Sequence, residues 1–167
     1  MEDKCILIGL DTSTSSTGFS IFENGELLSY FAIDMQKEKL TSEKKFDEMT
    51  RRVFENLNKY SPDIVVCELT SMTRNAVTQR TLTLLLGAVK GWCIMNNVFC
   101  HFFRASEWRK LVKNKDEKLP RKRVELKQWS IDKTRLLFNI DVNSNDISDA
   151  ILIGKAYINM IDNLNLD

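Results

Sequence analysis

The sequence is poor in the residues from which soft-metal and disulfide sites are built. Its 167 residues include one histidine and four cysteines, and no pair of cysteines has the Cys-x-x-Cys spacing of a zinc or redox site. All five lie within apolar runs: Cys5, Cys67, Cys93, Cys100 and His101. We therefore expect buried free thiols and a core histidine. Any metal that binds must be held by oxygen ligands.

Long hydrophobic segments are also absent. No apolar run approaches the roughly 18 residues of a membrane-spanning helix, and residues 1–4 lack the charged and apolar regions of a signal peptide. A cytoplasmic location is therefore expected. With 43% hydrophobic residues and no internal repeat, the chain suits a single domain over residues 1–167. Because the formal net charge is only +1, nucleic-acid binding would have to come from local clusters of Lys and Arg.

One stretch, residues 5–22, organises the rest of the chain. An apolar run ends on Asp11, six Ser and Thr residues follow, and an alternating run begins at Gly18. This order predicts a buried strand, a polar turn and a second strand. A carboxylate at the end of a buried strand lies at the edge of the sheet, where a substrate can reach it, so Asp11 is the first candidate site residue. The alternative is an Asp that only begins the turn through a local hydrogen bond.

The remaining pattern predicts an α/β fold with a five-stranded mixed sheet. Asn24-Gly25 between two alternating runs is the strongest short signal of a β-hairpin, so three antiparallel strands open the domain. A short apolar run at 64–67 then ends on Glu68 and repeats the strand-then-carboxylate pattern of Asp11. The periodicity further predicts helices over 42–59, 75–96, 106–112 and 122–138, a fifth strand over 98–103 and a last helix from 144.

The long helix predicted at 75–96 carries two apolar stripes. The first contains Leu82, Leu85, Leu86, Val89 and Cys93. The second contains Leu84, Ala88, Trp92 and Met95. One stripe suffices to cover a sheet, so the second faces either another helix of the same chain or the same helix in a second copy. Gly87 and Gly91 would allow a close approach of two backbones.

A basic segment lies between the two helices that follow. Residues 113–127 hold seven Lys and Arg residues against three Asp and Glu residues, a local net charge of +4. The basic side chains that we select as contacts for DNA phosphates are Lys113, Lys115, Lys118, Arg121, Lys122 and Arg123. A solvated surface segment is the alternative for such a run of charges, but Pro120 favours an extended loop that forms a phosphate-binding arm.

Four carboxylates stand out as candidate metal ligands. Asp11 and Glu68 end strands, and Asp146 and Asp149 project from one side of the first turn of the last helix. Crowded carboxylates are costly unless a cation neutralises them, and their hard oxygen atoms suit Mg²⁺ or Mn²⁺. Two such ions about 4 Å apart activate a water molecule and stabilise the leaving oxygen of a phosphodiester. Taken alone, an Asp pair at a helix start is also typical of a solvated helix N-terminus.

The order of these motifs resembles the RuvC family of Holliday junction resolvases. The motifs are Gly9-Leu10-Asp11, the Ser/Thr turn to Gly18, the strand that ends on Glu68, and Asp146-x-x-Asp149-Ala150. The resemblance extends over almost the whole chain, to about Ile158, and is greatest to the compact branch found in bacteriophages. It implies a ribonuclease H-like fold and Asp11, Glu68, Asp146 and Asp149 as a catalytic tetrad. It also implies Mg²⁺, with Mn²⁺ as a substitute, and a homodimer that cuts four-way junctions in recombination and repair.

One feature departs from the family pattern, and another follows it only loosely. The family commonly has an aromatic residue three positions after the catalytic Glu, where this chain has Ser71. Strict selectivity for junctions and for sequence is therefore an open question. The family's basic residues near the active site correspond to Arg109 or Lys110 and to Arg121 or Lys122.

Two other functions are compatible with parts of this pattern. Sugar kinases and actin-like ATPases share the opening Asp, turn and Gly, but they need a second glycine-rich loop and a longer chain; the six glycines here include none beside Glu68 or Asp146. A non-catalytic module for branched DNA, such as junctions or forks, with a structural acid cluster is the other alternative. Cleavage of a labelled junction in Mg²⁺ distinguishes these possibilities.

Overall fold

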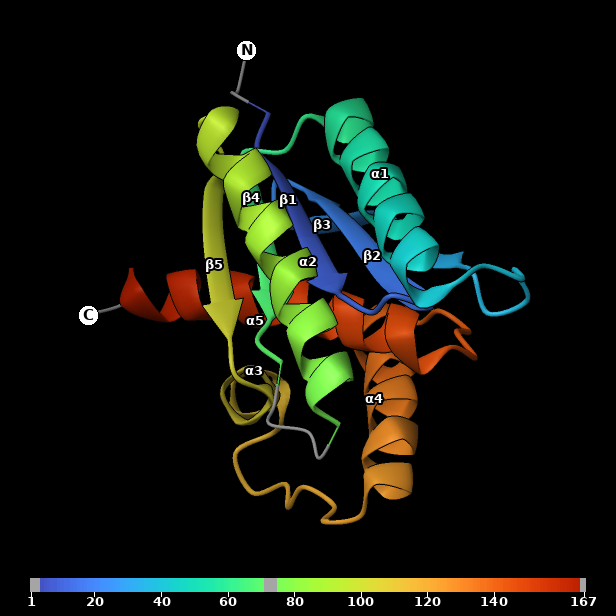
Figure 1. The fold of residues 1–167 in the computed structure, drawn as a ribbon. Helices are drawn as coiled ribbons and strands as arrows, with labels where there is room; N and C mark the ends of the chain where they lie inside the picture. The colour runs from blue at the N-terminus through green and yellow to red at the C-terminus, as the bar shows by residue number, and fades with distance from the viewer. Residues whose placement is uncertain (1–3, 71–74, 166–167) are drawn as a thin grey trace.

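A computed structural model of the chain describes residues 4–70 and 75–165 and contains a central five-stranded sheet (Figure 1). The strands are β1 (Ile6–Asp11), β2 (Ser16–Glu23), β3 (Glu26–Asp34), β4 (Ile64–Glu68) and β5 (Phe99–Phe103). Their order in the sheet is β3-β2-β1-β4-β5. The first three strands are antiparallel, whereas β4 is parallel to β1 and β5 is parallel to β4. The predicted mixed sheet is confirmed.

The hairpin between β2 and β3 forms at the predicted Asn-Gly dipeptide. Asn24 and Gly25 have positive φ values of 50° and 87°, which is the backbone of a type I′ turn. Glu23 pairs with Glu26 at the end of the ladder. The turn therefore fixes the register of β2 against β3, in which Gly18 pairs with Ala32. On its other side β2 pairs with β1, where Gly18 lies beside Asp11.

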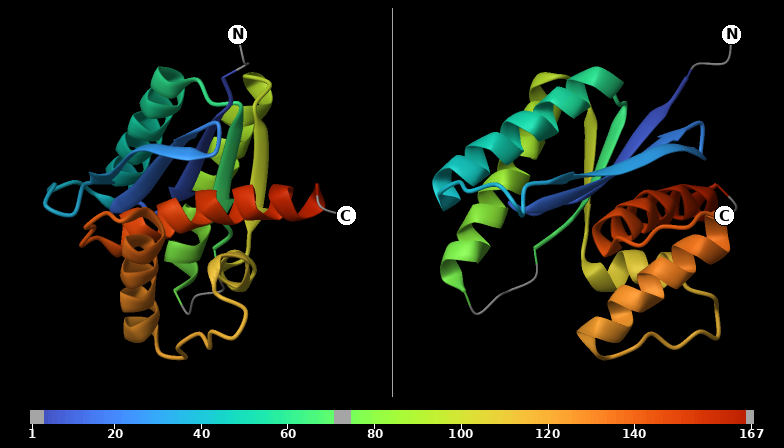
Figure 2. Two further views of the ribbon diagram at one scale, coloured as in Figure 1. Left: turned by 180° about the vertical axis from the view of Figure 1, so that it is seen from behind. Right: turned by 90° about the vertical axis from the view of Figure 1, so that its right-hand side faces the viewer.

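Five helices cover the two faces of the sheet (Figure 2). They are α1 (Ser42–Tyr60), α2 (Ala76–Met95), α3 (Ala105–Val112), α4 (Arg123–Phe138) and α5 (Asn145–Leu164). Helices α1 and α2 lie on one face, and α5 crosses the other face with α3 and α4 packed beside it (Figure 2). Side-chain caps fix three of the helix starts, from Thr41, Asn75 and Ser144. None of the helices in the described parts of the chain has the length and apolarity needed to cross a membrane.

The sheet separates two hydrophobic cores. One lies under α1 and α2 and includes Cys67, Cys93 and Cys100, whose thiols are free and buried as predicted. Cys5 is free but exposed, contrary to prediction, because it precedes β1 and lies outside the core. The other core lies under α3, α4 and α5. His101 on β5 is partly buried, with its ring 4.4 Å from that of Phe103.

The first apolar stripe of α2 faces the sheet, and its buried members are Leu85, Leu86, Val89 and Cys93. The second stripe divides. Trp92 packs against α1, where its indole N–H donates to Oδ1 of Asn58 at 3.0 Å and its ring lies 6.5 Å from that of Phe54. Leu84 and Met95 are instead 62% and 81% exposed. Trp92 therefore has a partner within the chain. The exposed face of α2 is rotated around the helix by about one residue from the predicted stripe.

Candidate active site

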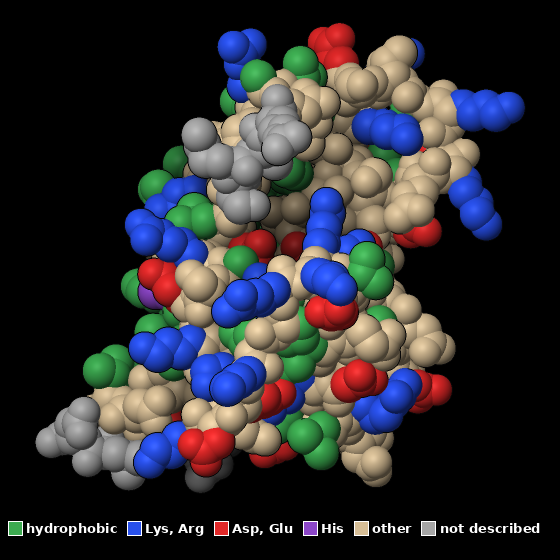
Figure 3. Space-filling view, turned by 90° about the horizontal axis from the view of Figure 1, so that it is seen from below, with side chains coloured by type: hydrophobic (Ala, Val, Ile, Leu, Met, Phe, Trp, Pro, Cys, Tyr) green, Lys and Arg blue, Asp and Glu red, His purple; other side chains and the backbone are tan. Residues whose placement is uncertain are grey.

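A cleft of about 720 Å³ opens at the carboxyl ends of β1 and β4. In the view of Figure 3, the surface is hollowed there, with carboxylates at the base and Lys and Arg side chains around the rim. All four predicted acids line the cleft: Asp11, Glu68, Asp146 and Asp149. Asp11 and Glu68 come from the last residues of adjacent parallel strands, Asp146 comes from the first turn of α5, and Asp149 lies three positions later on the same helix. The structure thus brings together carboxylates that are up to 138 positions apart in sequence.

Small residues on β1 and β2 let α5 approach the sheet closely enough to bring its two acids to Asp11. A Cβ atom at Gly18 would overlap the carbonyl oxygen of Asp146, and one at Gly9 would overlap that of Ala150. The hydroxyl of Ser20 donates to the Ala150 carbonyl at 2.7 Å and ties the helix to β2. These backbone contacts therefore hold the start of α5 against both β1 and β2, with the Asp146 carbonyl against Gly18, the residue that pairs with Asp11.

Burial and mutual repulsion make the acid cluster difficult to ionise. Burial raises the pKa of Asp11 well above its usual range, and the charges of Asp149, Glu68 and Asp146 raise it further, while Arg109 lowers it. Burial also raises the pKa of Asp149 to about 6, although Ser130 and Arg109 act in the opposite direction. Carboxylates held in this state bind a divalent cation that replaces their protons.

Glu68 is partly stabilised as a carboxylate by its neighbours. Burial raises its pKa, while a hydrogen bond from Trp108 and the charge of Arg109 lower it without cancelling the rise. The indole Nε1 of Trp108 donates to Oε2 of Glu68 at 2.5 Å. Sequence patterns could not identify this contact, because a buried Trp on a short amphipathic helix looks like any other core residue.

Asp146 points toward the wall of the cleft next to β2. Its Oδ2 accepts a hydrogen bond from the Ser16 hydroxyl at 2.6 Å, and its Oδ1 accepts one from the Asn145 amide at 2.8 Å. Consistent with this orientation, the described residues contain no group of three or more His, Cys, Asp or Glu side chains already arranged to hold a metal ion. Because this finding covers Asp11, Glu68 and Asp149 as well, side chains besides that of Asp146 would have to turn before three of these carboxylates could share one ion.

The side chains at the cleft nevertheless fit a hard divalent cation. The donors are carboxylate oxygens, which Mg²⁺ and Mn²⁺ prefer. Within the described part of the chain, Oδ1 of Asp149 is buried and accepts no hydrogen bond of good geometry, although the Ser130 hydroxyl is close enough to lower the pKa of this carboxyl. An uncompensated acceptor of this kind is costly unless something binds to it. Asp11, Glu68 and Asp149 all line the cleft and would hold such an ion once their side chains turn toward it.

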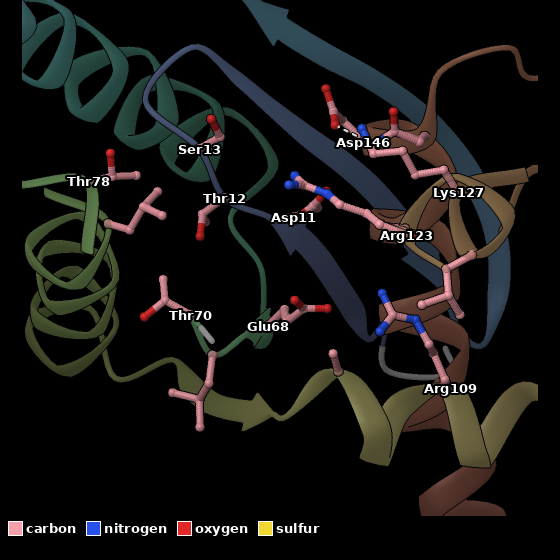
Figure 4. A pocket seen from close by; sticks show the side chains of 16 residues that line it. Asp11, Thr12, Ser13, Glu68, Thr70, Thr78, Arg109, Arg123, Lys127 and Asp146 are labelled. Atoms are coloured by element: carbon pink, nitrogen blue, oxygen red, sulfur yellow. Dashed lines mark hydrogen bonds between the residues drawn. The ribbon is translucent and has the colours of Figure 1, made fainter. Parts of the chain in front are cut away.

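Three basic side chains line the same cleft. Arg109 projects from α3, and Arg123 and Lys127 project from α4 (Figure 4). Arg109 and Arg123 are among the predicted DNA contacts, whereas Lys127 was counted in the basic segment but not selected. It could have been found from its spacing, because Lys127 lies four positions after Arg123 on one helix and therefore shares its face.

The other selected basic residues lie outside the cleft. Lys110, Lys115, Lys118, Arg121 and Lys122 are exposed, as a DNA-contacting surface requires. Lys113 is turned inward instead, and its Nζ donates to the backbone carbonyls of Asn114, Lys115 and Glu117 at 3.1 to 3.3 Å. We therefore remove Lys113 from the set of expected DNA contacts, because its ammonium group holds the loop together.

The arm formed by residues 113–122 is anchored by Glu117. Its Oε2 accepts from Nζ of Lys133 at 2.7 Å and from the backbone N–H of Asn114 at 2.8 Å, and its Oε1 accepts from the indole of Trp129 at 2.6 Å. The Lys133 side chain is only 2% exposed. The arm is thus a folded loop attached to α4. Ser71, where the family has an aromatic residue, lies outside the described residues.

Comparison with known proteins finds matches in structure but none in sequence. No protein-family model and no curated protein matches the sequence. Among solved structures, Thermus thermophilus RuvC in complex with a Holliday junction substrate aligns over 94% of this chain and 95% of its own, with a TM-score of 0.73 and 14% identity.

Two further Holliday junction resolvases have similar structures. The fowlpox virus resolvase aligns over 93% of this chain and 98% of its own, with a TM-score of 0.60 and 16% identity. The yeast mitochondrial enzyme aligns over 96% of this chain and 80% of its own, with a TM-score of 0.64 and 14% identity. The predicted ribonuclease H-like fold of RuvC and related resolvases is confirmed. The particular likeness to a phage branch remains a prediction.

Proposed function

We propose that the protein is a Mg²⁺-dependent endodeoxyribonuclease that cuts four-way DNA junctions. The observation that carries this proposal is the cleft, in which four carboxylates and three basic side chains meet at the carboxyl ends of β1 and β4. The chain's fold is shared with three junction resolvases, two of them in complex with Holliday junction DNA. Separately, an acid cluster or a basic rim has many uses, but together they suit a phosphodiester substrate.

Each group has a distinct role in this proposal. Ionised Asp11, Glu68 and Asp149 would hold the divalent cation, whose chemistry would be to activate a water molecule and to stabilise the leaving oxygen. Asp146 would complete the set after its carboxylate releases the Ser16 hydroxyl. Arg109, Arg123 and Lys127 bind the phosphates on either side of the reacting group and orient the strand. The raised pKa of Asp149, about 6, predicts that cleavage increases as the pH rises through this value, because metal binding requires the carboxylate.

A cleavage assay with a labelled synthetic junction tests the proposal. Wild type should nick the junction in Mg²⁺, whereas Asp11→Asn, Glu68→Gln, Asp146→Asn and Asp149→Asn should bind it as well or more tightly and cut it poorly. Asp162→Asn is a matched control, because it changes an exposed acid on α5 far from the cleft. If any one of the four variants cuts at a rate near wild type, the residue it changes does not belong to the metal site.

The same assay separates the two alternative functions. Junction binding by wild type without product in Mg²⁺ or Mn²⁺ would identify a non-catalytic DNA-binding module. A sugar-kinase or actin-like phosphotransferase is disfavoured because none of the six glycines lines the cleft. The cleft therefore lacks the glycine-rich backbone that binds nucleotide phosphates in such enzymes.

The exposed residues of the arm are proposed to contact the DNA backbone beyond the cleft. Replacing Lys115 and Lys118 with Gln should weaken binding to junctions and forks equally and reduce the slope of log affinity against log salt by roughly one per lost contact. Replacing Lys44 and Lys59 on α1 provides a control of equal charge. An unchanged slope would mean that the arm is only a solvated surface.

A second copy of the chain is proposed to pack on the exposed face of α2. Val77, Leu84 and Ile94 are each more than 60% exposed, and a Cβ atom at Gly87 or Gly91 would meet no atom within 4 Å. These positions follow a heptad spacing that suits helix-to-helix contact. A two-fold dimer would also provide the two acid clusters that paired cuts require.

The dimer proposal predicts that substitutions on this face reduce the mass of the protein in solution from that of a dimer to that of a monomer. Leu84→Glu with Ile94→Glu should yield a folded monomer that nicks one strand and rarely makes paired cuts. Ala88 and Met95 of the predicted stripe lie at the margin of the face, and Trp92 packs inside the chain. Sedimentation of wild type as a monomer at micromolar concentration would contradict the proposal.

A further inference from the structure

Trp108 contacts the acid cluster through the edge of its indole ring. The side chain is 0% exposed and lies in the core beneath α3 and α5. Its N–H donates to Oε2 of Glu68 at 2.5 Å, and a hydrogen bond to a carboxylate is stronger than one between two neutral groups. Because the ring is surrounded by core side chains, this donor has a fixed position, and it restrains one oxygen of a carboxylate that ends a strand.

The face of the same ring holds a cation. The guanidinium carbon of Arg109 lies 4.5 Å from the centroid of the Trp108 ring, within the range of a cation–π interaction. Within the described residues, Nε of Arg109 is buried and has no hydrogen-bond partner. Near Nε, contact with the aromatic face therefore stabilises the guanidinium in place of a hydrogen bond. The placement matters because the charge of Arg109 acts on Asp11, Glu68 and Asp149 alike.

We propose that Trp108 is a positioning residue for the active site. Its N–H fixes the Glu68 carboxylate toward the metal, and its ring face fixes the Arg109 guanidinium toward the phosphate. One side chain thus sets the distance between an anionic ligand and a cationic substrate contact. The proposal rests on the function proposed above. Hydrogen-bond partners that orient a metal ligand typically contribute 10- to 100-fold in metal affinity.

A second tryptophan provides a matched control for this role. Trp129 also donates its indole N–H to a glutamate, at 2.6 Å, and its ring lies 6.4 Å from that of Trp108. Its acceptor is Glu117 in the arm, outside the cleft. Trp108→Phe and Trp129→Phe therefore remove the same N–H from adjacent rings, but only the first removes a donor from the proposed metal site.

The experiment measures binding of Mn²⁺ alone by electron paramagnetic resonance and compares it with junction cleavage. Trp108→Phe should weaken Mn²⁺ binding by roughly 10- to 100-fold and lower cleavage in proportion, with the loss recovered at high Mn²⁺ concentration. Junction affinity without divalent cations should stay unchanged, because the phenyl ring still supports Arg109. Trp108→Leu should weaken junction binding as well, because it removes the aromatic face. Trp129→Phe should match wild type in Mn²⁺ binding.

A measurement on wild type keeps the test independent of whether a variant folds. With ¹⁵N-labelled tryptophan the chain gives three indole signals, which spectra of single Phe variants at Trp92 and Trp129 assign. Addition of Mg²⁺ should shift the Trp108 signal and leave that of Trp92 in place.

The possible failures are distinguishable. An unmoved Trp108 signal in protein that cuts junctions, or equal Mn²⁺ affinities in wild type and Trp108→Phe, would overturn the positioning role alone. Equal losses in Trp108→Phe and Trp129→Phe would mean that both rings act only through packing. A wild-type protein that neither binds Mn²⁺ nor cuts would overturn the proposed function and, with it, the role that rests on it.

Discussion

Two glutamates of this molecule have nearly the same hydrogen-bond donor and opposite electrostatic surroundings. Glu68 and Glu117 each accept from an indole N–H, at 2.5 and 2.6 Å. Burial raises the pKa of both carboxyls, but only Glu117 has a directly paired ammonium, from Lys133, together with a backbone N–H. These bonds lower the pKa of Glu117 to about 2, whereas the pKa of Glu68 stays raised.

The difference separates a carboxylate whose charge is neutralised within the chain from one whose charge is not. Glu117 is satisfied within the chain and has no capacity left for a ligand. Glu68 lies among three other acids at the base of a cleft, with its positive neighbour Arg109 lining the same space. A charge that the fold does not neutralise is available to a cation from solution. Substituting each of the two glutamates in turn should therefore affect different properties of the protein.

The largest expected effect is on cleavage. Glu68→Gln should lower the rate of junction cleavage by about 10³-fold or more, because it removes a charged metal ligand. Glu117→Gln should leave the rate per folded molecule within about two-fold of wild type. Single-turnover assays at saturating Mg²⁺ measure both. A comparable loss in Glu117→Gln would show that the arm also takes part in catalysis.

The next largest effect is on stability, for which Glu117 should matter more than Glu68. Glu117→Gln should lower the free energy of unfolding by roughly 3 kcal/mol, because it leaves the buried Lys133 ammonium without a counter-charge. Glu125→Gln on the exposed surface of α4, whose side chain is 51% exposed, should change it by less than about 0.5 kcal/mol. Urea denaturation measures both, and equal effects would indicate that the Glu117–Lys133 pair contributes little.

The sequence predicted one of these two glutamates and not the other. Glu68 follows a short apolar run, and Asp11 follows another, so strand periodicity alone brings them to the same edge of the sheet. Lys133 is a buried charge in a helix with no clear apolar face, and Glu117 is one charge in a basic run, so neither has a local signal. The packing of Trp92 against α1 was missed because it depends on a contact 34 positions away in sequence. The inward orientation of Lys113 was missed although its partners are close in sequence, because they are backbone carbonyls, which every residue has.

The pH dependence of stability should distinguish the two acidic environments. The folded-state pKa of Asp149 is raised from 3.8 to about 6, so this residue favours the folded state most when protonated, and its contribution declines as the pH rises from about 4 through about 6. The folded-state pKa of Glu117 is lowered from 4.5 to about 2. Its contribution is present above about pH 4.5 and declines as the pH falls toward 2.

The corresponding variants should move stability in opposite directions. Without divalent ions, Asp149→Asn should raise the free energy of unfolding by about 1 to 2 kcal/mol at pH 7.5, after allowance for solvent screening, and this gain should vanish below about pH 4. The loss in Glu117→Gln should instead be greatest at neutral pH. Thermal unfolding from pH 3 to 8 tests both, and a pH-independent effect of Asp149→Asn would mean that its pKa is not raised.

The smallest expected effect is stabilisation by the metal. Mg²⁺ at ten times its dissociation constant should stabilise wild type by about 1.4 kcal/mol, and by less at pH 5, where protons compete for the carboxylates. Asp11→Asn should abolish this gain, whereas Glu117→Gln should keep it on a lower baseline. Calorimetric melting with Mg²⁺, and with K⁺ at equal ionic strength, separates specific binding from salt screening.

The close approach of α5 to Gly9 and Gly18 also determines when the site exists during synthesis. The first two acids leave the ribosome with β1 and β4, but Asp146 and Asp149 follow only with the last helix. At roughly 5 to 20 residues per second, a nascent chain waits several seconds to half a minute between Asp11 and Asp149. The basic arm, residues 113–122, is made near the end of that interval, so the chain carries it only for the last few seconds without a complete acid cluster. The acid cluster is therefore completed in one step, when the C-terminal helix docks, and under the proposed function a partly made chain would leave bound DNA uncut.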